Sequence, residues 1–476
     1  MDDRRPDPDA PDRRPDPDVP DPLALDEYRP HWTAVLTDAE RWPTMTPEAE
    51  GRLRALRHHP LAPAWTHATG DRLTADGIVR ARTPLPLDGW LDEHLATARR
   101  LPAYRGYDGP LDALGDFPLL SRADLVDDVS AFVPLDADFD LMIHGSSSGT
   151  SGSALLIPDH VEDVARTFHL IVSLVRGAGR DWRPDPRRMA LAQLVHQRQA
   201  FTYASLLSSF EFATMARVNL HPSQWRDTAQ RDGFLRAQDP QVLTGNPTSL
   251  GDLLDPALVG ALHPLAIVSG AMHLERPLRE ALHDAYGCPV IDVYGLHETR
   301  PIAASVDGGP LFVLDRRLVV EIVSPAGDVL GEGEFGEIVV TAGENPLLPL
   351  VRYRTGDFGR LLRVDGRPAL ADLEGREATV FLAGDGAAVP CVDLTQHLQT
   401  GGALGWSVAQ ELSGDVTATI VRGDADLIRR TLSLLLRRDV TVTRVDTPAG
   451  LGEGKPRRYR SDVDPGVQGA HGQFMA

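Results

Sequence analysis

Lysine is almost absent from this chain of 476 residues. Lys455 is the only lysine among 48 lysine and arginine residues, and all the others are arginine. Arginine replaces lysine in surface ion pairs and in most phosphate contacts, but it does not replace a compact ammonium that reaches a reacting atom on a flexible stem. Lys455 is therefore a candidate catalytic residue. Taken alone, it is nearly as well explained as a lysine that survived in a surface loop.

Cysteine, long apolar runs and net positive charge are scarce as well. The two cysteines, Cys288 and Cys391, lie far apart, which excludes a disulfide framework and argues against a cysteine-based zinc site. No run approaches the length of a transmembrane helix and no N-terminal stretch resembles a signal peptide, so we expect a cytoplasmic protein without membrane contact. The net charge of −20 argues against nucleic-acid binding.

The length of the chain predicts more than one domain, because a single hydrophobic core rarely grows to this size. We expect a disordered tail over residues 1–22, which repeats proline, aspartate and arginine almost without apolar side chains. A large N-terminal domain is expected over residues 23–375 and a small C-terminal domain over 376–476, with the boundary in a composition change near Leu373–Thr379.

Beyond residue 100, short apolar runs alternate with amphipathic segments, which predicts an α/β fold with mostly parallel sheets. Leu265–Val268 and Val290–Val293 are expected to form parallel strands that a helix over Pro277–Tyr286 connects. Leu141–Ile143 is predicted to be a strand as well. Asp159 is expected to be the N-terminal cap of a helix that begins just after this aspartate.

The remainder of the sequence predicts a different pattern of secondary structure. Arg317–Val323 and Gly336–Thr341 are expected to belong to β-hairpins at the end of the large domain. A helix over Asp424–Leu436 and a strand over Val440–Val445 predict a small α+β unit in the last hundred residues, and this unit contains Lys455.

A serine- and glycine-rich segment, Ser146-Ser-Ser-Gly-Thr-Ser-Gly152, lies between the predicted strand at 141–143 and a second apolar run. Glycine N–H groups and hydroxyl groups can converge on a phosphate. The segment is not the usual P-loop, because no Lys-Ser/Thr pair follows it. A flexible linker is the alternative. The candidate phosphate-binding residues are Ser147, Ser148, Gly149, Thr150, Ser151 and Gly152.

Two further segments carry candidate nucleotide contacts. In Asp292-Val-Tyr-Gly-Leu-His-Glu-Thr299, the Tyr294 ring can stack on a base, Gly295 permits close approach, and Glu298 is a candidate Mg²⁺ ligand. An ordinary strand-to-loop junction is the alternative. Asp292 is a further candidate for cofactor binding.

The segment Val351-Arg-Tyr-Arg-Thr-Gly-Asp-Phe-Gly359 is the most specific in the chain. Two arginines, a glycine turn and Asp357 predict a compact polar cluster in which the aspartate accepts the two ribose hydroxyls. A salt-bridged β-turn is the alternative. Arg376, near the domain boundary, is a candidate for a further guanidinium contact with the nucleotide.

In this order, the segments resemble the motifs of the adenylate-forming ligase superfamily, which contains the acyl-CoA synthetases, and most of all those of its phenylacetate–CoA ligase branch. The resemblance covers roughly residues 100–460. The similar segments are a phosphate loop (Ser147–Gly152), a Thr-Pro-Ser-like segment (Gly245–Ser249), a Tyr-Gly-x-Thr-Glu motif (Tyr294–Glu298) and a fully matching Arg-Tyr-Arg-Thr-Gly-Asp signature (Arg352–Asp357). Lys455 stands where the family has its catalytic lysine.

The resemblance implies an enzyme that joins a carboxylic acid to ATP, releases pyrophosphate and holds an acyl-adenylate in its large N-terminal domain. Lys455, on a small mobile C-terminal domain, would bridge the carboxylate and the α-phosphate, Glu298 would hold Mg²⁺, and Asp357 would bind the ribose. The branch implies a planar aromatic acid and CoA as the acceptor, and it leaves a homodimer open. The candidate acid-pocket residues are Phe201, Tyr203, Ser269, Gly270, Ala271 and Met272.

The chain departs from the family pattern at several positions. Ser153 and His297 stand where relatives have lysine and threonine, and His297 is either a donor to a phosphate or a neutral packing histidine. Ala378 replaces an acidic hinge residue, and Ala383–Val389 replaces a loop that lines the thioester-forming site. An amine, a hydroxyl or a carrier-protein thiol therefore stays open as the acceptor. Activation of another oxyanion such as nitrite, or a nucleotide-binding pseudoenzyme, also stays open.

Overall fold

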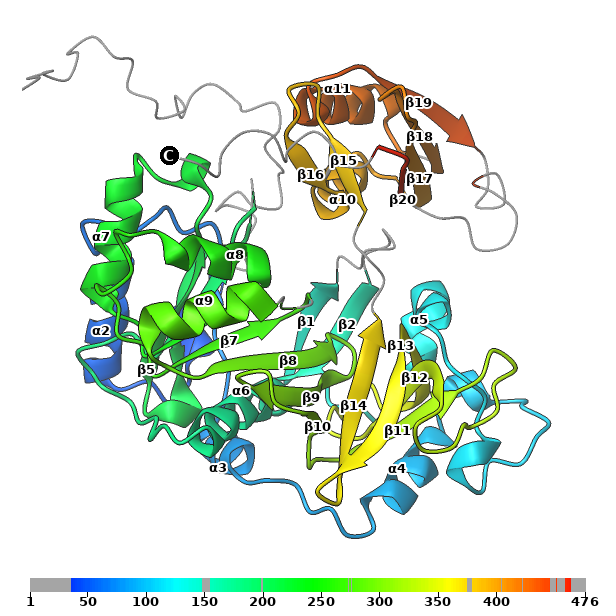
Figure 1. Ribbon diagram of the computed structural model, residues 1–476. Helices are drawn as coiled ribbons and strands as arrows, with labels where there is room; N and C mark the ends of the chain where they lie inside the picture. Colours follow the sequence, from blue (N-terminus) through cyan, green and yellow to red (C-terminus); the bar gives the residue numbers. More distant parts are fainter. Residues whose placement is uncertain are drawn as a thin grey trace, which may run out of the picture.

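The fold is described from a computed structural model of the chain (Figure 1). The described residues are 36–147, 155–197, 200–272, 274, 276–374, 379–403, 405–421, 423–445, 451 and 459–463. The predicted tail over residues 1–22 lies outside these ranges, so its disorder stays a prediction.

A large mixed sheet forms the centre of the described N-terminal part. Its strand order is β11-β12-β13-β14-β10-β9-β8-β7-β6-β3-β5-β4. The strands are β3 (Leu191–Val195), β4 (Tyr203–Leu207), β5 (Ala213–Asn219), β6 (Val242–Gly245), β7 (Ala266–Gly270), β8 (Val290–Leu296), β9 (Arg300–Val306), β10 (Leu311–Val313), β11 (Leu318–Val323), β12 (Phe335–Ala342), β13 (Leu350–Val364) and β14 (Arg367–Glu374).

Parallel pairing is confined to the middle of this sheet, where β5, β3, β6, β7 and β8 run side by side. The other neighbouring pairs are antiparallel. The prediction of mostly parallel sheets is therefore correct for the central strands and wrong for the whole sheet. The reason is local: after β8 the chain turns back directly into β9, and short turns then join consecutive strands, which favours antiparallel neighbours.

The predicted strand–helix–strand unit is confirmed. β7 and β8 are parallel neighbours, and α9 (Arg276–Tyr286) connects them. The backbone of Gly287 has a positive φ of 59°, a conformation that glycine adopts at the end of a helix without strain.

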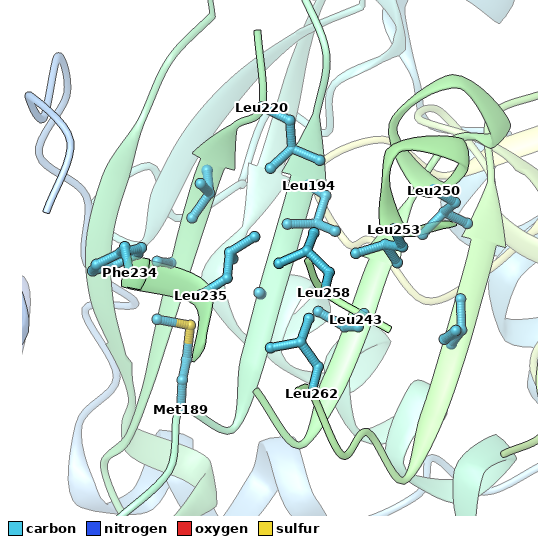
Figure 2. Close-up of a cluster of buried hydrophobic side chains, with 14 of the residues drawn as sticks. Met189, Leu194, Leu220, Phe234, Leu235, Leu243, Leu250, Leu253, Leu258 and Leu262 are labelled. Atoms are coloured by element: carbon cyan, nitrogen blue, oxygen red, sulfur yellow. The ribbon is translucent and has the colours of Figure 1, made fainter. Parts of the chain in front are cut away.

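Helices cover both faces of the central strands. On one face, leucines of α7, α8 and η8 pack against Leu194 and Leu243 of the sheet, as Figure 2 shows. On the other face, Val172 and Val175 of α6 pack against Val242 and Val268. Side chains of successive strand residues point to opposite faces, so these two clusters use alternate positions of the same strands.

Most of the remaining helices precede the sheet, as expected from the helical pattern before residue 100. The α-helices are α1 (Asp38–Arg41), α2 (Pro47–Arg57), α3 (Ala75–Arg82), α4 (Trp90–Ala98), α5 (Arg122–Asp128), α6 (Val161–Gly177), α7 (Thr228–Gln238) and α8 (Pro247–Gly251). The 3₁₀ helices are η3 (Pro102–Tyr104), η4 (Leu114–Asp116), η5 (Val129–Phe132), η6 (Ser208–Phe210), η7 (Pro222–Gln224) and η8 (Asp252–Leu254).

The serine- and glycine-rich segment begins in one strand of a hairpin and ends before the other, since β1 (Met142–Ser147) and β2 (Leu155–His160) are antiparallel partners. The helix α6 follows β2 directly. Its N-cap is His160, whose side chain accepts from the Glu162 N–H, so the prediction of Asp159 as the cap is wrong. The Asp159 carboxylate instead binds Arg300 and His297, which leaves the capping position to its neighbour.

The C-terminal part has its own sheet and its own core. β17 (Gly405–Gln410), β18 (Val416–Val421), β19 (Val440–Val445) and β20 (Tyr459–Ser461) form the sheet in the order β19-β18-β17-β20. The predicted helix and strand are confirmed as α11 (Ala425–Leu436), capped by Asp424, and β19. The other elements are α10 (Cys391–Thr400) and the hairpin of β15 (Val380–Leu382) and β16 (Ala388–Pro390).

In the part of the chain that the structure describes, no helix has the length and apolar character needed to cross a membrane.

Candidate functional site

The carboxyl ends of the central parallel strands lie at one edge of the sheet, where ligands bind in open α/β folds. Several predicted site segments end there. β6 ends at Gly245, β7 ends at Gly270, and β8 runs from Val290 through Tyr294 to Leu296. The sheet order β8-β7-β6 makes these ends neighbours.

Two of the predicted nucleotide contacts meet. The Tyr294 hydroxyl donates a hydrogen bond of 3.0 Å to Oδ2 of Asp357, which belongs to β13. Burial, and secondarily the Asp357 charge, raise the pKa of the Tyr294 phenol well above its usual range, so the hydroxyl keeps its proton and acts as a donor. The Asp357 N–H donates to Thr355 Oγ1 at 3.0 Å, which fixes the part of β13 that carries the carboxylate.

Gly295 lies at an irregularity of the β8–β9 ladder. A Cβ atom at this position would lie 2.4 Å from the Arg300 carbonyl oxygen and 2.7 Å from the Pro301 Cα. The absence of a side chain is therefore required by the neighbouring strand of the chain itself. The predicted close approach at Gly295 is present, and in this structure the backbone of Arg300 and Pro301 is what approaches the glycine.

Glu298, the predicted Mg²⁺ ligand, is 6 % exposed and forms an ion pair with Arg122 of α5. The Tyr353 hydroxyl donates to its Oε1 at 3.3 Å. Among the described residues, no group of three or more His, Cys, Asp or Glu side chains is arranged to hold a metal. A single carboxylate suits Mg²⁺ that is bound mainly through substrate phosphates and water.

His297 belongs to a buried charge network. Its Nε2 lies 3.0 Å from Asp159 Oδ2, and Arg300 binds both Asp159, at 2.6 Å, and Asp163, at 2.9 Å. Arg300 has a positive φ of 63°, so the network holds a backbone conformation that non-glycine residues rarely adopt. The network connects the strand after the serine- and glycine-rich segment, β2, with the Tyr294–Glu298 motif.

The two signature arginines are structural. Arg352 is 6 % exposed, lies 3.3 Å from Glu321 and donates to the Phe117 carbonyl oxygen. Arg354 binds Glu337, and the Gly356 N–H donates to the same carboxylate at 3.2 Å. The alternative of a salt-bridged β-turn is right about the ion pair of Arg354 and wrong about the turn, since the whole segment lies in the strand β13. The side chains beside Asp357 are those of Tyr294 and Thr355, where arginines were expected.

The candidate acid-pocket residues fall into two groups. Phe201 and Tyr203 surround the His67 ring, at centroid distances of 5.1 and 6.1 Å. Ser269 is fully buried and Gly270 ends β7, whereas Ala271, with φ of 65°, and Met272 are exposed. Since β5, β3 and β6 lie between β4 and β7, the strand order does not bring the two groups into direct contact.

The remaining predicted positions are only partly described. Ser147 is the last residue of β1, and Asp292 lies within β8, opposite Ser269 and Ser305. The other candidates lie outside the described residues: Ser148, Gly149, Thr150, Ser151, Gly152, Arg376 and Lys455. The same holds for Ser153 and Ala378.

Arg122, Asp159 and Arg300 are the polar residues of this region that sequence reasoning missed. Arg122 and Asp159 lie far from their partners in the chain and gave no local signal. Arg300 follows the Tyr294–Glu298 motif closely, and this position next to a motif was the one available signal. None of the predicted site residues lines the cavity of about 770 Å³ that Arg82, His169 and Arg176 border.

No family model matches the chain. It is similar to the phenylacetate-coenzyme A ligase of Pseudomonas putida, with 24 % identity over 269 residues, 54 % of this chain and 59 % of that ligase. It is similar to the phenylacetate-coenzyme A ligase of Escherichia coli K12, with 25 % identity over 268 residues, 53 % of this chain and 58 % of that ligase. The chain thus spans less than two thirds of these relatives.

Among solved structures, a 2-hydroxyisobutyryl-CoA ligase in complex with 2-HIB-AMP and CoA is 17 % identical. The comparison covers 94 % of this chain and 97 % of that chain, with a TM-score of 0.49.

Proposed function

We propose that this chain, a phenylacetate–CoA ligase-like member of the adenylate-forming ligase superfamily, is an ATP-dependent, AMP-forming acid ligase. It activates an aromatic acid as an acyl-adenylate, releases pyrophosphate and transfers the acyl group to CoA. The observation that supports this most is the hydrogen bond between Tyr294 and Asp357, because it brings together two motifs that are 63 residues apart.

The proposed nucleotide site uses residues from several segments. Tyr294 stacks on the adenine base. The Asp357 carboxylate accepts hydrogen bonds from the ribose hydroxyls in addition to the one from the Tyr294 hydroxyl. The segment Ser147–Gly152 donates to the phosphates. His297 has Nε2 engaged by Asp159, so Nδ1 is the ring nitrogen that faces a ligand in this proposal. Asp292, Gly295 and Arg376 border the nucleotide.

Mg²⁺ would be held by Glu298 together with phosphate oxygens and water, and it would neutralise phosphate charge. Arg122 already neutralises Glu298, so metal binding competes with an ion pair. The chain's own residues then orient the two anions: the acid carboxylate attacks the α-phosphorus while Lys455 compensates the charge of both. Pyrophosphate is the leaving group.

The acceptor of the acyl group depends on the loop between β15 and β16. Asp385, in the loop that replaces the family's thioester-site loop, forms an ion pair with Arg437, and Ala383 N–H donates to Ala387 O in the same turn. These contacts hold the loop between β15 and β16. The second candidate is the same adenylation with an amine, hydroxyl or carrier-thiol acceptor, and the altered sequence of this loop is its motive. The division into domains over 23–375 and 376–476, cytoplasmic location and a homodimer are parts of the same proposal.

Pyrophosphate release in the presence of ATP, Mg²⁺ and a panel of aryl acids tests the proposal. We expect acid-dependent release that Lys455→Ala lowers on the order of a hundredfold or more, because losing one preorganised cation typically costs about 2.7–4 kcal/mol. Mass spectrometry with and without CoA then separates thioester formation from adenylation alone.

Unchanged adenylation by the Lys455→Ala variant contradicts the assigned role of that lysine. ATP binding without pyrophosphate release for any acid or nitrite supports a pseudoenzyme instead. Arg458→Ala is the matched control, since it removes a neighbouring cation from the same segment and is expected to retain wild-type release.

A further inference from the structure

A row of polar side chains crosses neighbouring strands near the carboxyl ends of the sheet. Arg217 of β5 lies directly opposite Tyr203 of β4 and Gln193 of β3, and Gln193 lies opposite Thr244 of β6. Directly opposed residues share one face of a sheet. Thr244 is two residues from Val242, which packs against α6, so the row lies on the α6 face.

Arg217 is the charged residue of this row. It is partly buried, and its Nε is enclosed without a hydrogen-bond partner. Its neighbours on the same face, across and along the strands, are Tyr203, Gln193, Met215 and Asn219, and all four are neutral. Within the described part of the chain, no carboxylate forms an ion pair with Arg217.

Other buried arginines of this protein have carboxylate partners. Arg300 binds Asp159 and Asp163, and Arg316 lies 2.8 Å from Glu344. Partial burial removes some of the water around the Arg217 guanidinium, and a counter-ion beside it lowers that cost. The missing partner of Arg217 is therefore expected to be a ligand with a negative charge.

We propose that Arg217 binds a second anionic group on the acid that this chain activates, so that the substrate class is an aromatic acid with two negative charges. This inference rests on the proposed function. The Tyr203 hydroxyl donates to Gln193 Oε1 at 3.4 Å, and this hydrogen bond orients the two polar side chains on either side of Arg217. Phe201 and His67 add aromatic surface beside Tyr203.

The charge of the whole chain makes a local cation necessary. At −20, the protein repels a dianion, and only a site with its own positive group overcomes this. A second carboxylate fits a guanidinium because it accepts two parallel hydrogen bonds. The row also lies close to the carboxyl end of β6, since Thr244 is next to its last residue, Gly245.

Acid-dependent ATP–pyrophosphate exchange tests this with benzoate, the three benzenedicarboxylates and 4-carbamoylbenzoate. We expect wild type to prefer at least one dicarboxylate over benzoate and over the neutral amide of similar size. The Arg217→Met variant is expected to lower the kcat/KM ratio of dicarboxylate to benzoate by about tenfold to a hundredfold, since a hydrogen bond to a charged group typically contributes about 1.5–3 kcal/mol. Arg217→Lys should retain part of the ratio.

Arg183→Met is the matched control. Arg183 is exposed and pairs with Asp181, and its loss is expected to leave the ratio unchanged. Equal use of benzoate and every dicarboxylate by wild type, or a ratio that Arg217→Met does not change, overturns the inference while the acid ligase assignment stands.

A second readout separates the two proposals. If no acid supports exchange, the proposed function fails, and the thermal unfolding of wild type and Arg217→Met is then compared with and without each of the three benzenedicarboxylates. A dicarboxylate-dependent rise in Tm that only wild type shows supports an anion site at Arg217. An equal response of the two proteins contradicts it.

Discussion

At the scale of single residues, the Arg352–Asp357 signature divides into two kinds of side chain. Arg352 and Arg354 bind Glu321 and Glu337 and hold β13 in place. Asp357 is turned toward Tyr294. A sequence motif that suggests one polar cluster therefore contains structural ion pairs next to one candidate ligand contact, and a substitution in each should have different consequences.

The Tyr294→Phe substitution tests the role of Asp357 as a candidate ligand contact. It removes the hydroxyl that orients Asp357 and keeps the ring. We expect KM for ATP to rise about fivefold, because a hydrogen bond of this kind contributes about 1 kcal/mol, while kcat changes little. Steady-state pyrophosphate release at varied ATP measures this.

Tyr286→Phe is the matched control for this prediction. The Tyr286 hydroxyl donates to the Leu253 carbonyl oxygen at 2.6 Å and lies in α9. Its loss removes a comparable hydrogen bond away from Asp357, so KM for ATP should stay at the wild-type value. An equal rise of KM in both variants contradicts a specific role for Tyr294.

At the scale of secondary-structure elements, the junction of β8 and β9 is the most constrained part of the site. Tyr294 and Gly295 lie at an irregularity of the ladder, and Arg300 opens β9 with a positive φ. The Arg300 side chain returns to Asp159 at the end of β2. This junction thus links the strand after the serine- and glycine-rich segment to the motif that carries Glu298.

Gly295→Ala tests this junction. The new Cβ would meet backbone atoms of β9 that cannot rotate away, so we expect a loss of about 1–3 kcal/mol in the free energy of unfolding. Urea denaturation measures it. Gly51→Ala in α2 is the control: no atom lies within 4 Å of the added Cβ, and a gain of about 0.5–1 kcal/mol is expected in a helix. A neutral Gly295→Ala contradicts the close packing described for β8 and β9.

At the scale of the whole molecule, the segment before β1 is fixed to η6, which follows β4, by a partly buried carboxyl group. Asp71 Oδ2 accepts from the Ser208 N–H at 2.7 Å, and Oδ1 accepts from the Ser208 hydroxyl at 2.9 Å. Burial raises the pKa of Asp71 from 3.8 to about 6, although hydrogen bonds from Ser208 and Leu73 oppose the shift.

This raised pKa predicts a pH-dependent stability. The folded state holds the Asp71 proton up to about pH 6, whereas the unfolded state releases it near 3.8. The contribution is therefore complete below the lower value and is lost as the pH rises through the upper one, with a slope of at most about 1.4 kcal/mol per pH unit. Asp71→Asn should remove this fall from urea midpoints measured between pH 4 and 7. Asp76→Asn, at an exposed position of α3, should keep it, and identical profiles for all three proteins contradict the prediction.

The local elements and the order of the motifs follow from the amino-acid sequence alone. Helical spacing and capping residues suffice for α9 and α11, and an apolar run suffices for β19, because these depend on neighbours in the chain. The similarity to adenylate-forming ligases also rests on short segments such as Tyr294–Glu298, whose residues are contiguous.

Which of these residues contact one another depends on the three-dimensional fold. Arg122 reaches Glu298 from 176 residues away, and Asp159 takes Arg300 and His297 as partners where a helix cap was expected. Likewise, nothing near Arg217 in the sequence indicates that its neighbours across the strands are neutral. A charge is satisfied by whatever the fold places within a few ångströms, and strand order and register, which depend on the whole sheet, determine that placement.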